Sequence, residues 1–285
     1  MENITLIVVN AVFVAVLVLF AAGAGIRRMT RLPDQEFQPP VLPIGKVPVW
    51  FYRRLDLIGA ASIAAVFYLL AMANLMVEPA KGTPALTLEG IGFSIGFQFF
   101  MAAVAIGLVV KRTNVWHWLG LKWRQWPLVF AIAPITVFGM WALFAGLYAI
   151  GYMDLMETLG VEKVQEVVTV FQTEKSPLLL GLMAFTAAFV APVCEEVVFR
   201  GYLYPVMKKF SGPWVAGLCS SLIFSAVHGS FAALLPLFIF GMVLVVLYEW
   251  TGSIWLPISV HFLFNSATVV IQLAGRYYGL DMEVP

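Results

Sequence analysis

The chain has 285 residues, of which 61% are hydrophobic and 12% are charged, and its formal net charge is +1. A typical soluble domain carries about 25% charged residues, so this composition excludes an ordinary soluble protein and indicates an integral membrane protein. Nucleic-acid-binding proteins present a basic face. The sequence shows none, so nucleic acid is excluded as a partner.

Eight hydrophobic segments are long enough, or nearly so, to cross a bilayer, which takes about 20 apolar residues. They span residues 4–25, 57–77, 91–110, 127–152, 177–199, 213–229, 231–249 and 254–274. The sixth segment is short and the seventh contains Pro236. The first lacks the basic start of a signal peptide, so we interpret it as a retained helix. We predict an all-α polytopic membrane protein with about eight transmembrane helices.

The basic residues are unevenly divided between the links that join these segments. Thirteen of the 17 lie in three alternate links, which span residues 26–56, 111–126 and 200–212. Lysine and arginine are enriched in the cytoplasmic loops of membrane proteins. These three links are therefore predicted to be cytoplasmic, and both termini external.

The chain divides into two parts that we expect to belong to one integral membrane domain. Residues 1–176 contain the first four segments and a polar link. Within that link, the stretch 154–172 repeats apolar residues at helical spacing with acidic residues between them. It predicts an amphipathic helix on the outer surface, or an ordinary packed connector. Residues 177–275 contain the last four segments.

Two glutamates, two histidines and an asparagine fall inside the apolar segments of this second part: Glu195, Glu196, His228, His261 and Asn265. Polar groups at membrane depth are costly unless they are paired or hydrated, so such a set indicates a functional site. Residues four apart share a helix face. Glu196 can therefore pair with Arg200, while Glu195 is rotated by about 100° and points elsewhere. The same spacing relates Phe224 to His228, and His261 to Asn265.

Helix rise gives an estimate of the depth of each residue. Glu195 lies about 26 Å along its segment from the outer side, which is near the cytoplasmic end. From the cytoplasmic side, His261 lies at about 10 Å and Asn265 at about 16 Å, so these three residues fit one cavity open to the cytoplasm. His228, about 22 Å from Pro213, fits this cavity less well.

Three motifs carry these residues: "EEVVFR" matches EExxxR, "FSAVH" matches FxxxH and "HFLFN" matches HxxxN. In this order, on late hydrophobic segments, they resemble the CPBP family of CAAX proteases and bacteriocin-processing enzymes, also called the Abi family. That family includes the Ras-converting-enzyme type of CAAX prenyl endopeptidase. The resemblance covers about 180–270, while the first 150 residues carry no matching motif. It implies an intramembrane endopeptidase with residues 177–275 as its catalytic core.

The resemblance also implies a role for each matching residue. Glu195 is similar to the catalytic glutamate that activates water, and His228 to its histidine partner. His261 and Asn265 are similar to the pair that stabilises the oxyanion. The remaining motif residues are supports: Glu196, Arg200 and Phe224. The chemistry agrees, because a desolvated carboxylate can act as a general base and each oxyanion donor is worth about 3 kcal/mol.

Cofactor use is open from the residues alone. Zinc could bind Glu195, His228 and His261, but HExxH is absent, and the fourth position would be the weak amide of Asn265. We expect a metal-free reaction in which glutamate-activated water cuts a peptide bond near the cytoplasmic face. Cys194 points about 100° away from Glu195, so we interpret it as a buried apolar residue rather than a nucleophile.

The expected partners are the lipid bilayer and a lipidated or transmembrane peptide substrate, in the cell membrane of a prokaryote. Two other functions stay open. One is a non-catalytic membrane binding, immunity or scaffold protein of the same fold. The other is a proton-coupled transporter, although the internal repeats that transporters often contain are not visible.

Overall fold

The computed structural model describes residues 4–30, 46–76, 86–161 and 166–279, and every regular element within these ranges is helical. The prediction of an all-α polytopic membrane protein is confirmed. In chain order the elements are α1 Ile4–Thr30, α2 Leu55–Met76, α3 Leu88–Val109, α4 Val115–Trp118, η2 Trp126–Leu128, α5 Val129–Ala149, α6 Tyr152–Thr158, α7 Glu166–Thr173, α8 Pro177–Phe185, η3 Thr186–Val190, α9 Ala191–Glu196, η4 Val197–Leu203, α10 Tyr204–Ser211, α11 Pro213–Ala226, α12 Phe231–Thr251 and α13 Trp255–Tyr278.

The number of membrane crossings differs from the prediction. Within the described ranges, seven helices are long and apolar enough to cross a bilayer. The predicted sixth crossing is α11, which has only 14 residues. At 1.5 Å per residue it is about 21 Å long, which is short of the roughly 30 Å of a hydrocarbon core. The count of eight is therefore corrected to seven long helices and one short one.

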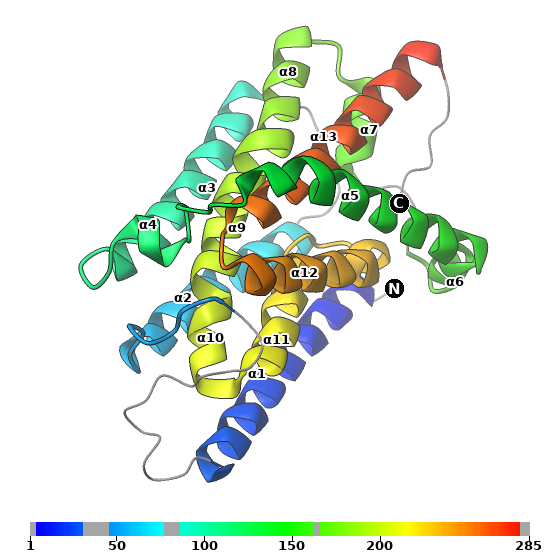
Figure 1. The fold of residues 1–285 in the computed structure, drawn as a ribbon. Coiled ribbons are helices and arrows are strands. Elements are labelled where there is room, and N and C mark those ends of the chain that lie inside the picture. Colours follow the sequence, from blue (N-terminus) through cyan, green and yellow to red (C-terminus); the bar gives the residue numbers. More distant parts are fainter. Residues whose placement is uncertain (1–3, 31–45, 77–85, 162–165, 280–285) are drawn as a thin grey trace.

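Elements α8, η3, α9, η4 and α10 form one helical unit of 35 residues, Pro177–Ser211, which runs through the length of the molecule in Figure 1. The predicted segment ends at residue 199, because basic residues follow. In the structure Arg200 and Lys208 are buried inside the bundle, with 1% and 2% of their surface exposed. The predicted link 200–212 is therefore wrong, and only Gly212 separates this unit from α11.

Two π-helical stretches, η3 and η4, interrupt this unit, and prolines explain where they end. A helical proline has no N–H and its ring clashes with a carbonyl of the preceding turn. Just before Pro192 the backbone widens, so that the Ala191 N–H donates to the Thr186 carbonyl five residues back. The same widening precedes Pro205. Such π-bulges are frequent at functional sites.

Side chains of the N-terminal part form hydrogen bonds with this unit at the Gly201 carbonyl, which Pro205 leaves without an amide donor. The Gly201 carbonyl, four residues before Pro205, accepts hydrogen bonds from the Tyr52 hydroxyl and the Trp118 indole N–H, both at 2.9 Å. Tyr52 precedes α2, and Trp118 ends α4. A backbone group that proline would otherwise orphan is thereby satisfied by side chains from two other elements.

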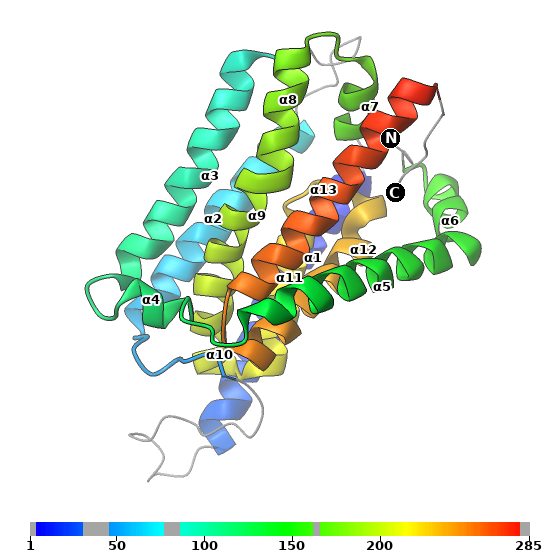
Figure 2. The same cartoon turned by 45° about the horizontal axis from the view of Figure 1, so that its top comes forward.

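Most basic residues gather at one end of the molecule, called the basic end below. Arg112, after α3, forms an ion pair of 2.5 Å with Asp56 at the start of α2. Lys209 donates a hydrogen bond of 3.2 Å to the Trp50 carbonyl. Figure 2 places the end of α1, α4 and the end of α10 together at this end. The clustering agrees with the predicted orientation, but the side of the membrane stays a prediction.

The buried core lies where the Pro177–Ser211 unit meets the later helices. Leu203, Leu244 and Val260 have no exposed surface. There α11 packs against α12, α10 and α1, and α13 packs against α5. The core therefore surrounds the stretch of chain that carries the paired glutamates.

The predicted single helix over 154–172 is wrong. Two short helices, α6 and α7, replace it, and the chain turns at Gly160, whose φ is +76°. Residues 162–165 lie outside the described part of the chain. Met153 and Met156 of α6 are buried in one cluster with Ala232, and Ile4 at the start of α1 packs against them. This connector therefore lies away from the basic end.

Candidate active site

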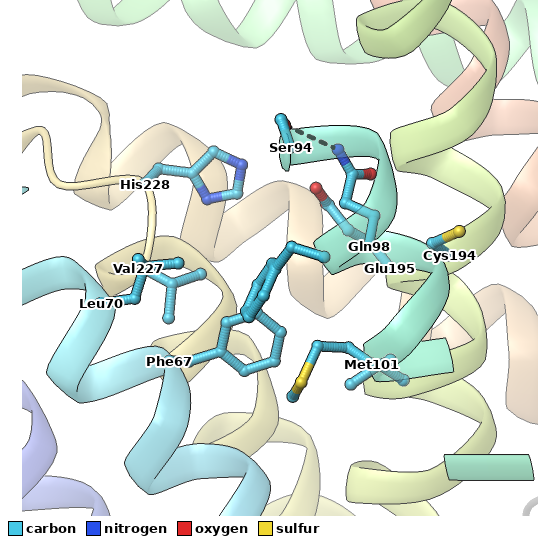
Figure 3. A pocket seen from close by; sticks show the side chains of 11 residues that line it. Phe67, Leu70, Ser94, Gln98, Met101, Cys194, Glu195, Val227 and His228 are labelled. Atoms are coloured by element: carbon cyan, nitrogen blue, oxygen red, sulfur yellow. Dashed lines mark hydrogen bonds between the residues drawn. The ribbon is translucent and has the colours of Figure 1, made fainter. Parts of the chain in front are cut away.

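A pocket of about 260 Å³ lies beside the middle of the Pro177–Ser211 unit (Figure 3). Its walls come from α2, α3, the α9–η4 stretch and the turn that follows α11. Most of the lining is apolar. Four hydrogen-bonding side chains reach it: Ser94, Gln98, Glu195 and His228. The two predicted catalytic residues are thus brought to one cavity, Glu195 from α9 and His228 from the turn after α11.

Glu195 presents its carboxylate to this pocket. The residue is half-buried, and its Oε2 atom is fully buried without a hydrogen bond from any described residue. A polar atom in this state is costly unless a ligand or water supplies a donor. The free oxygen is therefore the natural place for a proton to be taken up.

His228 lies in the turn between α11 and α12 and faces Glu195 across the pocket in Figure 3. Its Nδ1 is 2.7 Å from the Phe224 carbonyl oxygen. A carbonyl only accepts hydrogen bonds, so Nδ1 carries the proton of this contact. The Phe224 ring also packs edge-on against the imidazole, with centroids 4.9 Å apart. The FxxxH spacing thus fixes the ring and leaves Nε2 for a ligand.

Glu196 points to a different neighbourhood and is fully buried, with none of its surface exposed. Its Oε1 accepts a hydrogen bond from Arg200 Nη1 at 2.8 Å and lies 2.9 Å from His261 Nδ1. The Arg200 guanidinium also stacks on Phe224, 4.4 Å from the ring centroid. The predicted pair of Glu196 with Arg200 is confirmed. Of the two adjacent glutamates, Glu195 is the one that a substrate can reach.

His261 and Asn265 contact the catalytic helix but do not belong to the described lining of the pocket. Asn265 Nδ2 donates to the Ala187 carbonyl at 2.8 Å. This carbonyl has no backbone donor, because Ala191 donates one residue further back and Pro192 has no N–H. Both side chains thus hold α13 against the helix of the glutamates. Their role as an oxyanion pair stays a prediction, which would use His261 Nε2 and the second N–H of Asn265.

The depth of the site differs from the estimate for Glu195, which assumed a helix ending at residue 199. Phe67 of α2 and Gln98 of α3 both line the pocket. Phe67 lies eleven residues from Asp56, and Gln98 eleven residues from Val109, where these helices reach the basic end. Each interval spans about 16 Å of helix from the basic end, near the middle of a bilayer. His228, at the end of the short α11, reaches this same level. Glu195 therefore lies near the middle of its helical unit rather than near the end of it, while cleavage near the cytoplasmic face stays a prediction.

The sequence interpretation missed the wall that α2 and α3 supply. Ser94 and Gln98 lie four apart on α3 and share a face, and Gln98 Nε2 donates to Ser94 Oγ at 3.5 Å. A signal existed, since an amide inside an apolar span is as unusual as a carboxylate. No motif marked it, because the three motifs all lie after residue 190.

The two cysteines are buried and free, as predicted. In Figure 3 the Cys194 thiol points away from the Glu195 carboxylate and from His228. A nucleophilic thiol needs an adjacent base and an electropositive setting. The arrangement gives Cys194 neither.

The zinc alternative does not fit this arrangement. Across the described residues, no three His, Cys, Asp or Glu side chains are close enough to hold a metal ion. The set Glu195, His228 and His261 fails because His261 is engaged by Glu196 on the other face of the helix. Zinc sites need three converging protein ligands.

Part of the chain matches the model of a known protein family. Residues 177–267 match the family described as type II CAAX prenyl endopeptidase Rce1-like. The chain is 30% identical over 143 residues to "Putative membrane peptidase YdiL" of Bacillus subtilis (strain 168), covering 47% of this chain and 56% of the relative. It is 32% identical over 100 residues to "Membrane-embedded CAAX protease MroQ" of Staphylococcus aureus (strain USA300), covering 33% and 40%. The chain thus spans about half the length of these curated relatives. No solved structure matches it.

Proposed function

We propose that this chain is an intramembrane endopeptidase of the CAAX-protease type, and the match of residues 177–267 to the Rce1-like family supports the proposal. One observation carries the proposal. Glu195 of α9 and His228 of the turn after α11 line one pocket beside the long apolar helices, and the Glu195 carboxylate has a buried oxygen without a donor among the described residues. The apolar walls suit a lipidated or transmembrane peptide, whose scissile bond would lie between the two side chains.

Each residue has a defined part in the proposed hydrolysis. Glu195 takes one proton from a water molecule, whose oxygen attacks the carbonyl carbon while the C=O electron pair moves to the oxygen. His228 donates to that oxyanion when its Nε2 carries a proton, in addition to the predicted oxyanion donors His261 and Asn265. The intermediate then collapses, the C–N bond breaks, and the leaving nitrogen takes the proton from Glu195. A carboxylic acid and an amine result, and Glu195 is regenerated as the carboxylate.

The direct test is cleavage by the purified protein in detergent or liposomes. A panel of prenylated peptides, other lipidated peptides and transmembrane peptides is incubated with the protein, and new termini are identified by mass spectrometry. We expect at least one substrate to be cut by the wild type and left intact by Glu195→Gln. If the folded wild-type protein cuts none of these peptides, the proposal of an endopeptidase is wrong, and a protein that binds without catalysis is favoured.

Metal chelation is expected to leave cleavage unchanged. The reaction as drawn uses a carboxylate and an imidazole, and the described residues do not assemble three metal ligands. The measurement is the initial rate after dialysis against EDTA and against phenanthroline. Loss of activity that returns with one equivalent of zinc would contradict this and would assign Glu195, His228 and His261 as ligands.

The basic end is expected to face the cytoplasm, so that water and the polar part of the substrate reach the pocket from that side. Two matched single-cysteine variants test this in a background without Cys194 and Cys219. Lys122→Cys lies in the basic link after α4, and Glu157→Cys lies on α6, away from the basic end. Both residues are exposed.

A bulky, membrane-impermeant maleimide applied to intact cells is expected to label the cysteine at 157 and spare the one at 122. Permeabilisation should make both reactive. Labelling at 122 and protection at 157 in intact cells would show that the orientation, and with it the side of cleavage, is reversed.

A further inference from the structure

Gln98 of α3 is a polar residue in the pocket that no catalytic motif includes. The residue lies in the middle of a 22-residue apolar helix, and its side chain is half-buried. Its Nε2 donates to Ser94 Oγ, which leaves Oε1 as the free end of the amide. That oxygen is fully buried and accepts no hydrogen bond from the described part of the chain. An amide held in this way needs a donor that the protein does not provide.

Glu195 has the same unmet need in the same pocket. Its Oε2 and the Gln98 Oε1 are both buried acceptors, and both side chains line one cavity of about 260 Å³. Figure 3 shows both side chains among those that line the pocket, together with His228. Two acceptors repel each other unless a donor lies between them.

Water is the one small group that can donate to both. It has two O–H bonds, whereas a peptide N–H has a single hydrogen to give. A water molecule that donates to Glu195 and to Gln98 directs its lone pairs away from both oxygens, into the open part of the pocket. His228 lines the same pocket, so a scissile carbonyl bound there would lie between this water and His228.

We infer that Gln98, together with Glu195, holds and orients the water that attacks the scissile carbonyl. The inference rests on the proposed function and extends its machinery to the N-terminal half of the chain. Glu195 removes one hydrogen of this water, and the amide oxygen of Gln98 accepts a hydrogen bond from the other. Gln98 gains and loses no proton in the step.

The test compares two identical substitutions at buried glutamines. Gln98→Met keeps the length of the side chain and removes its strong acceptor. Gln272→Met makes the same change on α13, at a glutamine that is 2% exposed, lies outside the described pocket lining, and likewise has buried amide atoms without partners. Both are assayed with the substrate found for the wild type, together with their thermal unfolding in detergent.

Gln98→Met is expected to lower kcat by about 100-fold and to change KM by less than about 2-fold, because an interaction made by the attacking water acts on the chemical step. Gln272→Met is expected to keep kcat within about 2-fold of the wild type, as changes away from the reacting groups usually do. An unchanged kcat in Gln98→Met would overturn the inference. So would a loss that Gln272→Met shares, or one that appears only in KM.

A second measurement keeps this inference separate from the proposed function. A structure of the wild-type protein in lipid, at a resolution that shows ordered water, should contain a water within hydrogen-bonding distance of Glu195 Oε2 and Gln98 Oε1. A direct hydrogen bond between the two side chains would overturn the inference even in an active enzyme. If the water is present but the protein cuts no peptide, the water site stands and the protease proposal is wrong.

Discussion

Replacing Glu195 with glutamine is expected to lower the cleavage rate by at least about a thousand-fold, within the range that a general base supplies. Glutamine has almost the same shape but cannot take a proton from water. The buried Oε2 of Glu195 has no partner among the described residues, so the substitution breaks no hydrogen bond there. The folded state should therefore be unaffected. The measurements are the initial rate of product formation and the thermal unfolding temperature in detergent.

Glu89→Gln is the matched control for this variant. Glu89 lies in the first turn of α3 and is exposed, so the same change of charge should leave the rate unaltered. If Glu195→Gln kept more than about a tenth of the wild-type rate, the loss would be under about 1.4 kcal/mol. That is too little for the general base, and the assignment would be wrong.

Replacing Arg200 with methionine is expected to lower the free energy of unfolding by about 3–5 kcal/mol, because it leaves the buried Glu196 carboxylate without its cation. The two side chains are 2.8 Å apart, and at most 1% of either is exposed. The change also removes the guanidinium from the Phe224 ring and from the Gly241 carbonyl. Denaturant titration in mixed micelles provides the measurement.

A double variant separates the charge from the packing. Glu196→Gln combined with Arg200→Met removes both charges, and we expect it to be more stable than Arg200→Met alone. Arg124→Met, at an exposed position in the basic link, should change stability by no more than about 0.5 kcal/mol. If the double variant were no more stable than Arg200→Met, packing rather than charge would account for the loss.

The class of protein and the part of the candidate site that lies after residue 190 could be predicted from the sequence. Long apolar segments require helices, because a bilayer leaves no other way to satisfy the backbone of a single chain segment. The spacing of Glu196 and Arg200 predicted their ion pair, because four residues make nearly one helical turn. It also separated Glu195 from Glu196 by face, and the structure confirms that only Glu195 reaches the pocket.

Other features depend on tertiary contacts that helical spacing does not encode. Charge ended the predicted fifth segment at residue 199, yet Arg200 and Lys208 continue the helix because partners inside the bundle neutralise them. That error placed Glu195 near the end of its helix, whereas the helix continues to Ser211. Neither the engagement of His261 by Glu196 nor the approach of Gln98 could be predicted, since each depends on which helices pack together.

The Ala187 carbonyl, which Pro192 leaves without an amide donor, has a consequence for how the protein is made. Helix Pro177–Ser211 emerges from the ribosome well before α13, and until then the Ala187 carbonyl lacks the Asn265 amide that serves it. Over the same interval Glu196 has Arg200 as a partner but not His261. The helix of the glutamates is therefore completed only when the last described helix docks. Two contacts of this helix, from Asn265 to Ala187 and from His261 to Glu196, therefore form only after α13 has been synthesised.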